Sequence, residues 1–251
     1  MAITFKTAGT YTNLTSSGVV VIPGSPAADD RMFLFATWKP YTVTQTAPAG
    51  WTAIGSEYAD GTVGSGVGTG SMKVQAWYRD WQSGDANPTI PTSGGSLDGG
   101  SGVILIFSKD SGDTWGTPLT ANAAWPSSSS QTVSATSTVA VPNSSVVMSL
   151  VGFADDIFAI TRSATALDVA TGITWAADYV EAPATHFSSA LAADSSADLG
   201  YRYVTTGGTV TLRTTATLTT AETGAVKFVA QGITAGGGGG GGATGSGFFL
   251  W

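Results

Sequence analysis

The sequence predicts an all-β protein, an antiparallel two-sheet β-sandwich of jelly-roll-like type that is followed by a glycine-rich C-terminal tail. Three observations lead to this fold class. Gly, Ser and Thr make up 98 of the 251 residues, whereas charged residues account for only 11%. Short runs of β-prone residues recur along the chain, with Gly, Pro, Ser and Asp between them. No stretch of eleven or more residues keeps the 3.6-residue apolar period of an amphipathic helix.

The first half of the chain contains six candidate strands. Residues 31–38 (RMFLFATW) are apolar at nearly every position, which predicts a central strand buried on both faces. Residues 72–81 (MKVQAWYRDW) alternate instead, and the alternation places Trp77 together with Arg79 on a polar face. This pattern predicts a half-buried strand with an outward-facing Trp77. In order, the candidates span residues 3–7, 18–22, 31–38, 51–56, 72–81 and 103–107.

The second half contains six more candidate strands. We expect a hairpin over residues 201–213, because Thr-Gly-Gly at 206–208 can supply the positive φ angles of a tight reversal. In this hairpin Arg202 would face solvent. The stretch 109–130, which precedes the first candidate strand of this half, is interpreted as a long loop. The candidate strands span residues 146–153, 173–178, 186–192, 199–205, 209–215 and 225–233.

The C-terminal segment 235–251 differs in composition from the β-sandwich body expected over residues 1–234. A run of seven glycines precedes four large apolar residues. One interpretation is a flexible tail. The other is an assembly anchor, because four exposed apolar side chains form the kind of patch that soluble monomers avoid. We favour the anchor, since packing against other subunits would offset the ordering cost of polyglycine, about 1–2 kcal/mol per residue. Its residues include Gly236, Gly242, Phe248, Phe249, Leu250 and Trp251.

Charge and cysteine content exclude several functions. The net charge is −7 and the ten basic residues are scattered singly, which argues against nucleic acid and against an anionic membrane surface as partners. The chain has no Cys, so a disulfide framework and a thiolate metal site are excluded. The N-terminus shows no secretory signal, and the longest apolar run, residues 103–107, is too short to span a membrane. We therefore expect a soluble protein made in the cytoplasm.

The sequence offers little catalytic chemistry. His186 is the single histidine, which excludes a multi-histidine metal site, and no G-x-S-x-G motif is present. A polysaccharide hydrolase needs two carboxylates about 5–10 Å apart, and with only three Glu this is the least favoured reading. The acidic pairs at 29–30 and 155–156 lack calcium-loop spacing and are interpreted as turn residues. We predict no enzyme activity, no metal and no cofactor.

Three tryptophans and an arginine are candidates for ligand or partner contact. Most tryptophans are expected in the core. Trp77 is the exception, because an outward indole can stack on a sugar ring or become buried in a neighbouring subunit. Trp115 and Trp125 lie in the presumed loop and are candidates of the same kind, and Arg79 lies beside Trp77.

Four motifs follow one another in the first half of the chain: the turn and strand at 47–55 (APAGWTAIG), the strand 74–79 (VQAWYR), Gly84-Asp85 followed by Pro88-Thr89, and the apolar strand 103–107. Together they resemble motifs of tailed-bacteriophage virion proteins. The resemblance covers residues 1–233 and rests on architectural positions, so no functional residue is carried over. Similar chains often have a Gly-Asp turn where this one has Ala-Asp-Asp-Arg at 28–31. The family comprises minor tail, fibre and head-associated proteins, which are β-sandwich structural or adhesion modules without known catalysis.

The resemblance and the tail together predict a non-enzymatic virion structural protein on the particle exterior. Its expected partners are copies of itself and neighbouring virion proteins, held through the C-terminal tail, with host-surface glycan as a further contact. The alternative function is a glycan-binding adhesion module.

Overall fold

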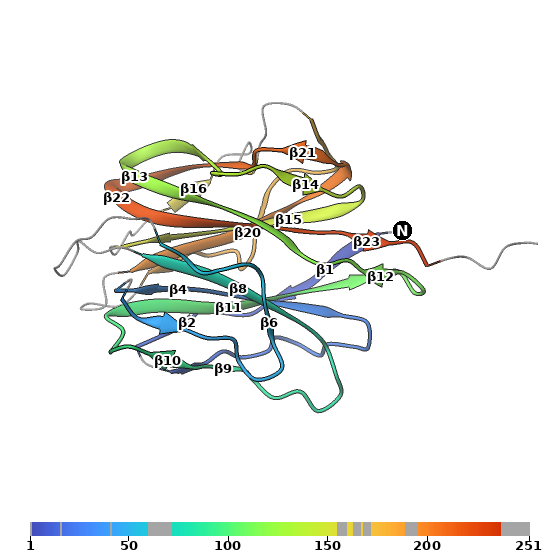
Figure 1. Cartoon of the computed structure of the whole chain (residues 1–251), viewed down its shortest axis with the longest axis horizontal. Coiled ribbons are helices and arrows are strands. Elements are labelled where there is room, and N and C mark those ends of the chain that lie inside the picture. Colours follow the sequence, from blue (N-terminus) through green and yellow to red (C-terminus); the bar gives the residue numbers. More distant parts are fainter. Residues whose placement is uncertain are drawn as a thin grey trace, which may run out of the picture.

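The computed structural model describes residues 2–15, 17–40, 42–59, 72–154, 160–162, 167, 172–188 and 195–236. Every regular element in these ranges is a β-strand, and none of them is a helix. The predicted all-β class is therefore confirmed. Figure 1 shows two layers of long strands, one above the other, with short strands and loops on their outer sides.

The lower layer in Figure 1, here called the N-sheet, comes entirely from the first half of the chain. The nine residues of its central strand, 31–39, are all buried, in agreement with their apolar sequence. The strand order is β1 (Ile3–Ala8), β11 (Gly99–Lys109), β4 (Arg31–Lys39), β8 (Lys73–Asp80), β6 (Thr52–Ala53), with β2 (Thr12–Asn13) beside β11 and β7 (Tyr58–Ala59) beside β8. All of its pairings are antiparallel.

The upper layer, the C-sheet, comes from the second half. Its central strand, 145–153, is again buried at all nine positions. The strand order is β13 (Leu119–Ser134), β22 (Arg213–Gln231), β15 (Ser145–Phe153), β20 (Ser196–Thr206), β17 (Thr174–Trp175). Beside them lie β16 (Ile160–Arg162) on β22, and β18 (Val180–Glu181) and β19 (Phe187–Ser188) on β20.

The two sheets repeat one topology. Each half has four long strands, and across the sheet they lie in the order first, fourth, second, third, counted along the chain. A short strand from the connection between the second and third long strands then pairs with the third. The small sheets follow the same plan, because β3 (Gly18–Val19) pairs with β9 (Thr89–Ile90) in one half and β14 (Val139–Val141) pairs with β21 (Gly208–Val210) in the other. Two further small sheets join β5 (Thr44–Gln45) to β10 (Thr92–Ser93) and β12 (Thr114–Trp115) to β23 (Ile233–Thr234). The two halves of the chain thus form an internal structural repeat.

The register of the strands supports this repeat at the level of single residues. Tyr78 lies opposite Phe33 in the N-sheet, and Tyr201 lies opposite Met148 in the C-sheet. Each tyrosine is followed by an arginine in the third long strand of its half. Arg202 is consequently the counterpart of Arg79.

Apolar side chains form three layers. The central layer lies between the two sheets and includes Phe33 of β4 and Met148 of β15. Because successive side chains of a strand alternate, Leu34 points into an outer layer beneath the loops of the first half, and Val147 points into an outer layer of the second half. The central strands of both sheets are therefore buried on both faces, and the face of β8 predicted to be polar is covered.

Two local expectations are wrong. The presumed loop 109–130 contains β12 and most of β13, an edge strand that follows β22 closely. The hairpin over 201–213 does not form, since β20 and β22 lie on opposite sides of β15 and pair with it instead of each other. Neither Gly207 nor Gly208 takes a φ in the left-handed region.

Candidate functional site

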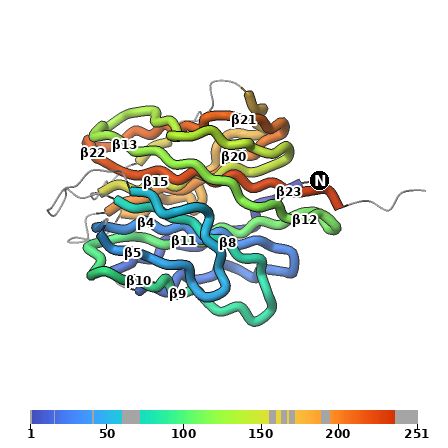
Figure 2. The backbone as a smooth tube through the Cα atoms, viewed as in Figure 1, coloured from blue at the N-terminus to red at the C-terminus, as the bar shows by residue number. Residues whose placement is uncertain are grey.

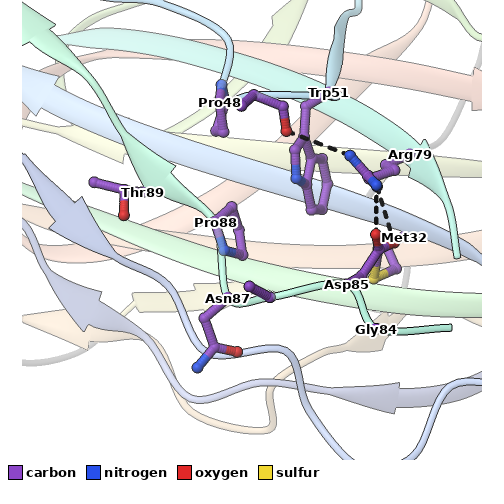
Figure 3. A pocket seen from close by; sticks show the side chains of 11 residues that line it. Met32, Pro48, Trp51, Arg79, Gly84, Asp85, Asn87, Pro88 and Thr89 are labelled. Atoms are coloured by element: carbon purple, nitrogen blue, oxygen red, sulfur yellow. Dashed lines mark hydrogen bonds and ion pairs between the residues drawn. The ribbon is translucent and has the colours of Figure 1, made fainter. Parts of the chain in front are cut away.

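A pocket of about 440 Å³ opens on the outer side of the N-sheet, where two loops meet (Figure 3). One wall is the loop 46–51 between β5 and β6, and the other is the loop 81–88 between β8 and β9. Loops held on a rigid sheet are a common setting for binding sites. The lining residues are Met32, Pro48, Ala49, Trp51, Arg79, Gly84, Asp85, Ala86, Asn87, Pro88 and Thr89.

Arg79 and Asp85 form a bidentate ion pair at the edge of this pocket. The Arg79 Nε donates to Asp85 Oδ2 at 2.9 Å, and its Nη2 donates to Oδ1. The Arg79 Nη1 donates to the carbonyl oxygen of Ala49 at 3.3 Å, so the guanidinium contacts both walls. Asp85 Oδ2 also accepts the backbone N–H of Gln82 at 3.0 Å, which ties the carboxylate to its own turn. The fold therefore sets the geometry of the pair.

Gly50 permits the close approach of Arg79 to the first wall. It has a φ of 77°, a conformation that favours glycine, in a turn closed by the hydrogen bond from Trp51 N–H to the Pro48 carbonyl at 3.0 Å. A Cβ atom at position 50 would lie 1.7 Å from the Arg79 Nη1. The turn thus needs glycine for its backbone and for the space that the guanidinium occupies.

Of the four predicted contact residues, only Arg79 lines this pocket. Trp77 does not face solvent, because it is 1% exposed and packs within the outer apolar layer of the first half. Alternation indicates on which side of the sheet Trp77 lies, but the loops of the first half cover that side. The expected outward indole is therefore wrong, and Trp51 is the tryptophan that borders the pocket.

Trp115 and Trp125 lie elsewhere, on β12 and β13. Trp115 is half-buried and its Nε1 donates to the carbonyl oxygen of Asp29 at 2.9 Å. Trp125 is buried, with its ring in edge-to-face contact with Phe153 at a centroid distance of 5.4 Å. The structure therefore does not bring the three predicted tryptophans together.

The predicted anchor is described only at its first residue. The backbone N–H of Gly236 donates to Asp113 Oδ1 at 3.2 Å. A Cβ atom at position 236 would lie 1.7 Å from the carbonyl oxygen of Gly112, so the chain passes this turn very closely. The remaining anchor residues, Gly242, Phe248, Phe249, Leu250 and Trp251, lie outside the described residues.

The acidic pair at 29–30 behaves as turn residues, as expected. Asp29 has a φ of 73°. Asp30 Oδ2 accepts the Ala27 N–H and the Lys6 ammonium, each at 2.7 Å. The second acidic pair, at 155–156, lies outside the described residues.

A buried ion pair joins two strands of the C-sheet. The side chains of Arg162 on β16 and Asp198 on β20 are both 0% exposed, with 2.6 Å between Arg162 Nε and Asp198 Oδ2. The guanidinium also donates to Ser149 Oγ at 3.2 Å, and the Tyr179 hydroxyl donates to Asp198 Oδ2 at 3.4 Å.

The same burial perturbs the acid. Burial raises the pKa of Asp198 to about 6, although the Arg162 guanidinium and, more weakly, His186 act to lower it. Burial also raises the pKa of Tyr179 well above its ordinary value. Perturbed acids often mark functional sites. Here the fully enclosed pair instead links β16 to β20 within the fold.

Sequence reasoning did not assign Trp51, Asp85 or Asn87 to a site. It used the first two only as markers of turns. The signal available in the sequence is that Trp51 and Asp85 each directly follow a turn glycine, Gly50 and Gly84. Both glycines have a positive φ in the structure, and the two turns form walls of the pocket.

Comparisons of the chain with protein-family models, with curated proteins and with solved structures find no significant match. Within the described ranges, no group of three or more His, Asp or Glu side chains is placed to hold a metal ion. The same part of the chain contains no helix that is long and apolar enough to cross a membrane.

Proposed function

We propose that the protein is a non-enzymatic structural component of a bacteriophage virion, held on the particle exterior as a minor tail, fibre or capsid-associated protein. Its body is a β-sandwich in which each sheet comes from one half of the chain. This arrangement differs from a jelly roll, in which strands that follow one another in the chain alternate between the two sheets. The segment 235–251 connects this body to other copies or to neighbouring virion proteins.

The observation that carries the proposal is the fixed point from which the C-terminal segment departs. β23 pairs with β12, and the Gly116 N–H donates to the Gly232 carbonyl at 3.0 Å just before it. Gly236 is then held by Asp113, as described above. Figure 2 shows that this point lies at the same end of the molecule as the N-terminus. A connecting segment that leaves a rigid body at a defined place suits a subunit that is incorporated by its end.

The outer surface fits the same role. On the exposed part of β13 and β22, hydroxyl groups pair across the strands, with 2.7 Å between the Oγ1 atoms of Thr132 and Thr215 and 3.3 Å between Ser130 Oγ and Thr217 Oγ1. Such uncharged polar pairs stabilise a solvated sheet face. The motifs within residues 1–233 that resemble those of phage virion proteins are the sequence observation behind the proposal.

The test compares the full chain with a variant that lacks residues 237–251, which leaves the described contact of Gly236 in place. Size-exclusion chromatography with light scattering reports self-association, and incorporation into particles reports neighbouring virion proteins. We expect the deletion to abolish both. A matched variant that changes Phe248, Phe249, Leu250 and Trp251 to Ser keeps the glycines and should behave like the deletion. Normal assembly of both variants would show that the segment is no anchor.

A further inference from the structure

We propose that the pocket between the loops 46–51 and 81–88 binds a neutral saccharide. Among its eleven lining residues only Arg79 and Asp85 are charged, and they are paired with each other. A phosphate or carboxylate ligand would have to compete with Asp85 for the guanidinium and would meet a protein of net charge −7. A cationic ligand would compete with the guanidinium for Asp85 in the same way. The pocket therefore favours an uncharged ligand.

The paired side chains present the polar groups that sugar hydroxyls need. A guanidinium offers five N–H donors in one plane, and a carboxylate accepts about four hydrogen bonds. In the pair, Arg79 uses three N–H groups, toward Asp85 and Ala49, and Asp85 accepts from Arg79 and Gln82. Two N–H groups of Arg79 and about one acceptor position of Asp85 therefore remain for a ligand. Adjacent hydroxyl groups of a pyranose, each both donor and acceptor, match such an edge.

The remaining walls suit the apolar face of a sugar ring. Figure 3 shows the Trp51 indole between Pro88 and Arg79, with Pro48 above it. Rings of this kind pack against the C–H face of a pyranose, while its hydroxyls remain free to bond at the rim. The volume of about 440 Å³ lies within the range of small-molecule sites and can hold one or two sugar units.

The site is built before any ligand arrives. The Arg79 guanidinium is held by both walls, Asp85 is tied to Gln82, and the Asn87 Oδ1 accepts the Ile22 N–H at 2.9 Å. Binding would therefore order few side chains, which favours affinity for a small ligand. A single hexose in such a pocket has a dissociation constant of about millimolar order.

The experiment titrates the full chain with D-glucose, D-galactose, D-mannose and N-acetyl-D-glucosamine, with N-acetylneuraminic acid and D-glucosamine as charged comparisons. NMR spectra follow the Trp51 indole N–H and the Arg79 Nε–H. We expect at least one neutral sugar to shift both signals. Arg79→Met should weaken that binding by about tenfold or more. Arg202→Met, at the equivalent position of the other half, should leave it unchanged.

A second variant separates binding from folding. Ala86 is exposed, so Ala86→Phe keeps the ion pair and narrows the pocket, and it should also abolish binding. If both pocket variants bound the sugar as tightly as the unchanged chain does, the sugar would bind outside this pocket. Tighter binding of a charged sugar, or no binding of any neutral one, would also overturn the proposal. None of these outcomes bears on assembly through residues 237–251, so the two functions are tested separately.

Discussion

Arg31 of the N-sheet donates a hydrogen bond from Nη1 to the Oε1 atom of Gln231 in the C-sheet, at 3.0 Å and across 200 residues of sequence. The same Nη1 donates to the carbonyl oxygen of Gly116 at 2.7 Å. The other guanidinium nitrogens hold Asp80, at 2.6 and 2.9 Å. One cation therefore bonds the two halves of the repeat at the edge of the central apolar layer.

Replacement of this cation should weaken the whole molecule. Arg31→Met leaves the buried Oε1 atom of Gln231 without its donor and removes one of the two donors to the Gly116 carbonyl, which keeps the Gln231 Nε2. We expect a loss of about 2–4 kcal/mol in the free energy of unfolding. Urea denaturation measures it. Asp80→Asn is the matched control: the Asp80 side chain is 47% exposed, so its loss should cost about 1 kcal/mol or less. If both variants lost the same free energy of unfolding, the hydrogen bonds of Arg31 to Gln231 and Gly116 would not be its main contribution to stability.

Lys227 should make the stability depend on pH in the alkaline range. The side chain is 0% exposed, and its ammonium donates to two neutral oxygens, the Ser56 carbonyl at 2.9 Å and Asn122 Oδ1 at 3.5 Å. Burial lowers the pKa of Lys227 to about 8, from 10.5. Between these values the unfolded chain binds more protons than the folded one, so the free energy of unfolding rises as the pH rises from about 8 to 10.5.

Lys227→Met should remove this rise and increase the free energy of unfolding at pH 7 by on the order of 1–3 kcal/mol. Urea denaturation at a series of pH values measures both effects. Lys6→Met is the control, because it leaves Lys227 in place and should keep the rise. If Lys227→Met were less stable than the parent at every pH, the two hydrogen bonds would outweigh the cost of burial.

The buried pair of Arg162 and Asp198 should show strong coupling. At pH 8, above the pKa of the acid, Asp198→Asn leaves a buried guanidinium without its counter-charge and should cost about 3–5 kcal/mol. The double variant Arg162→Met, Asp198→Leu removes both charges. We expect it to lose at least about 2 kcal/mol less than the sum of the single replacements. Additive losses in this double-mutant cycle would show that the two charges do not stabilise each other.

Two glycines of the pocket loops allow a matched comparison. Gly50 and Gly84 both have positive φ, at 77° and 91°, so alanine at either position should cost about 1 kcal/mol through the backbone alone. Alanine at position 50 would also collide with Arg79, whereas nothing lies within 4 Å of a Cβ at position 84. We expect Gly50→Ala to cost about 1–2 kcal/mol more than Gly84→Ala in urea denaturation. Similar costs would mean that Arg79 moves aside freely.

Strand-forming segments were predictable where the sequence itself is strongly apolar or alternating. The central strands of both sheets were identified in this way. β13 was missed because its Ser, Ala, Asn and Pro content is poor in β-branched and aromatic residues, and it forms a strand by pairing along β22. The hairpin at 201–213 failed because local turn residues do not reveal that β15 lies between β20 and β22.

The candidate site was predictable only in part. Arg79 was identified from its place beside Trp77, but its partner Asp85 and the wall residue Trp51 belong to loops that meet only in the folded chain. Burial of Trp77 depends on the same loops. Periodicity along one strand contains no information about what packs over it, so the covered face could not be distinguished from an exposed one.

The repeated topology also allows positions of the two halves to be matched residue by residue. Here Trp77 stands at the position of Gly200, and Gln75 at that of Asp198. The two halves therefore carry different side chains at matched positions, and one has an open pocket where the other has a sealed ion pair on the same architecture.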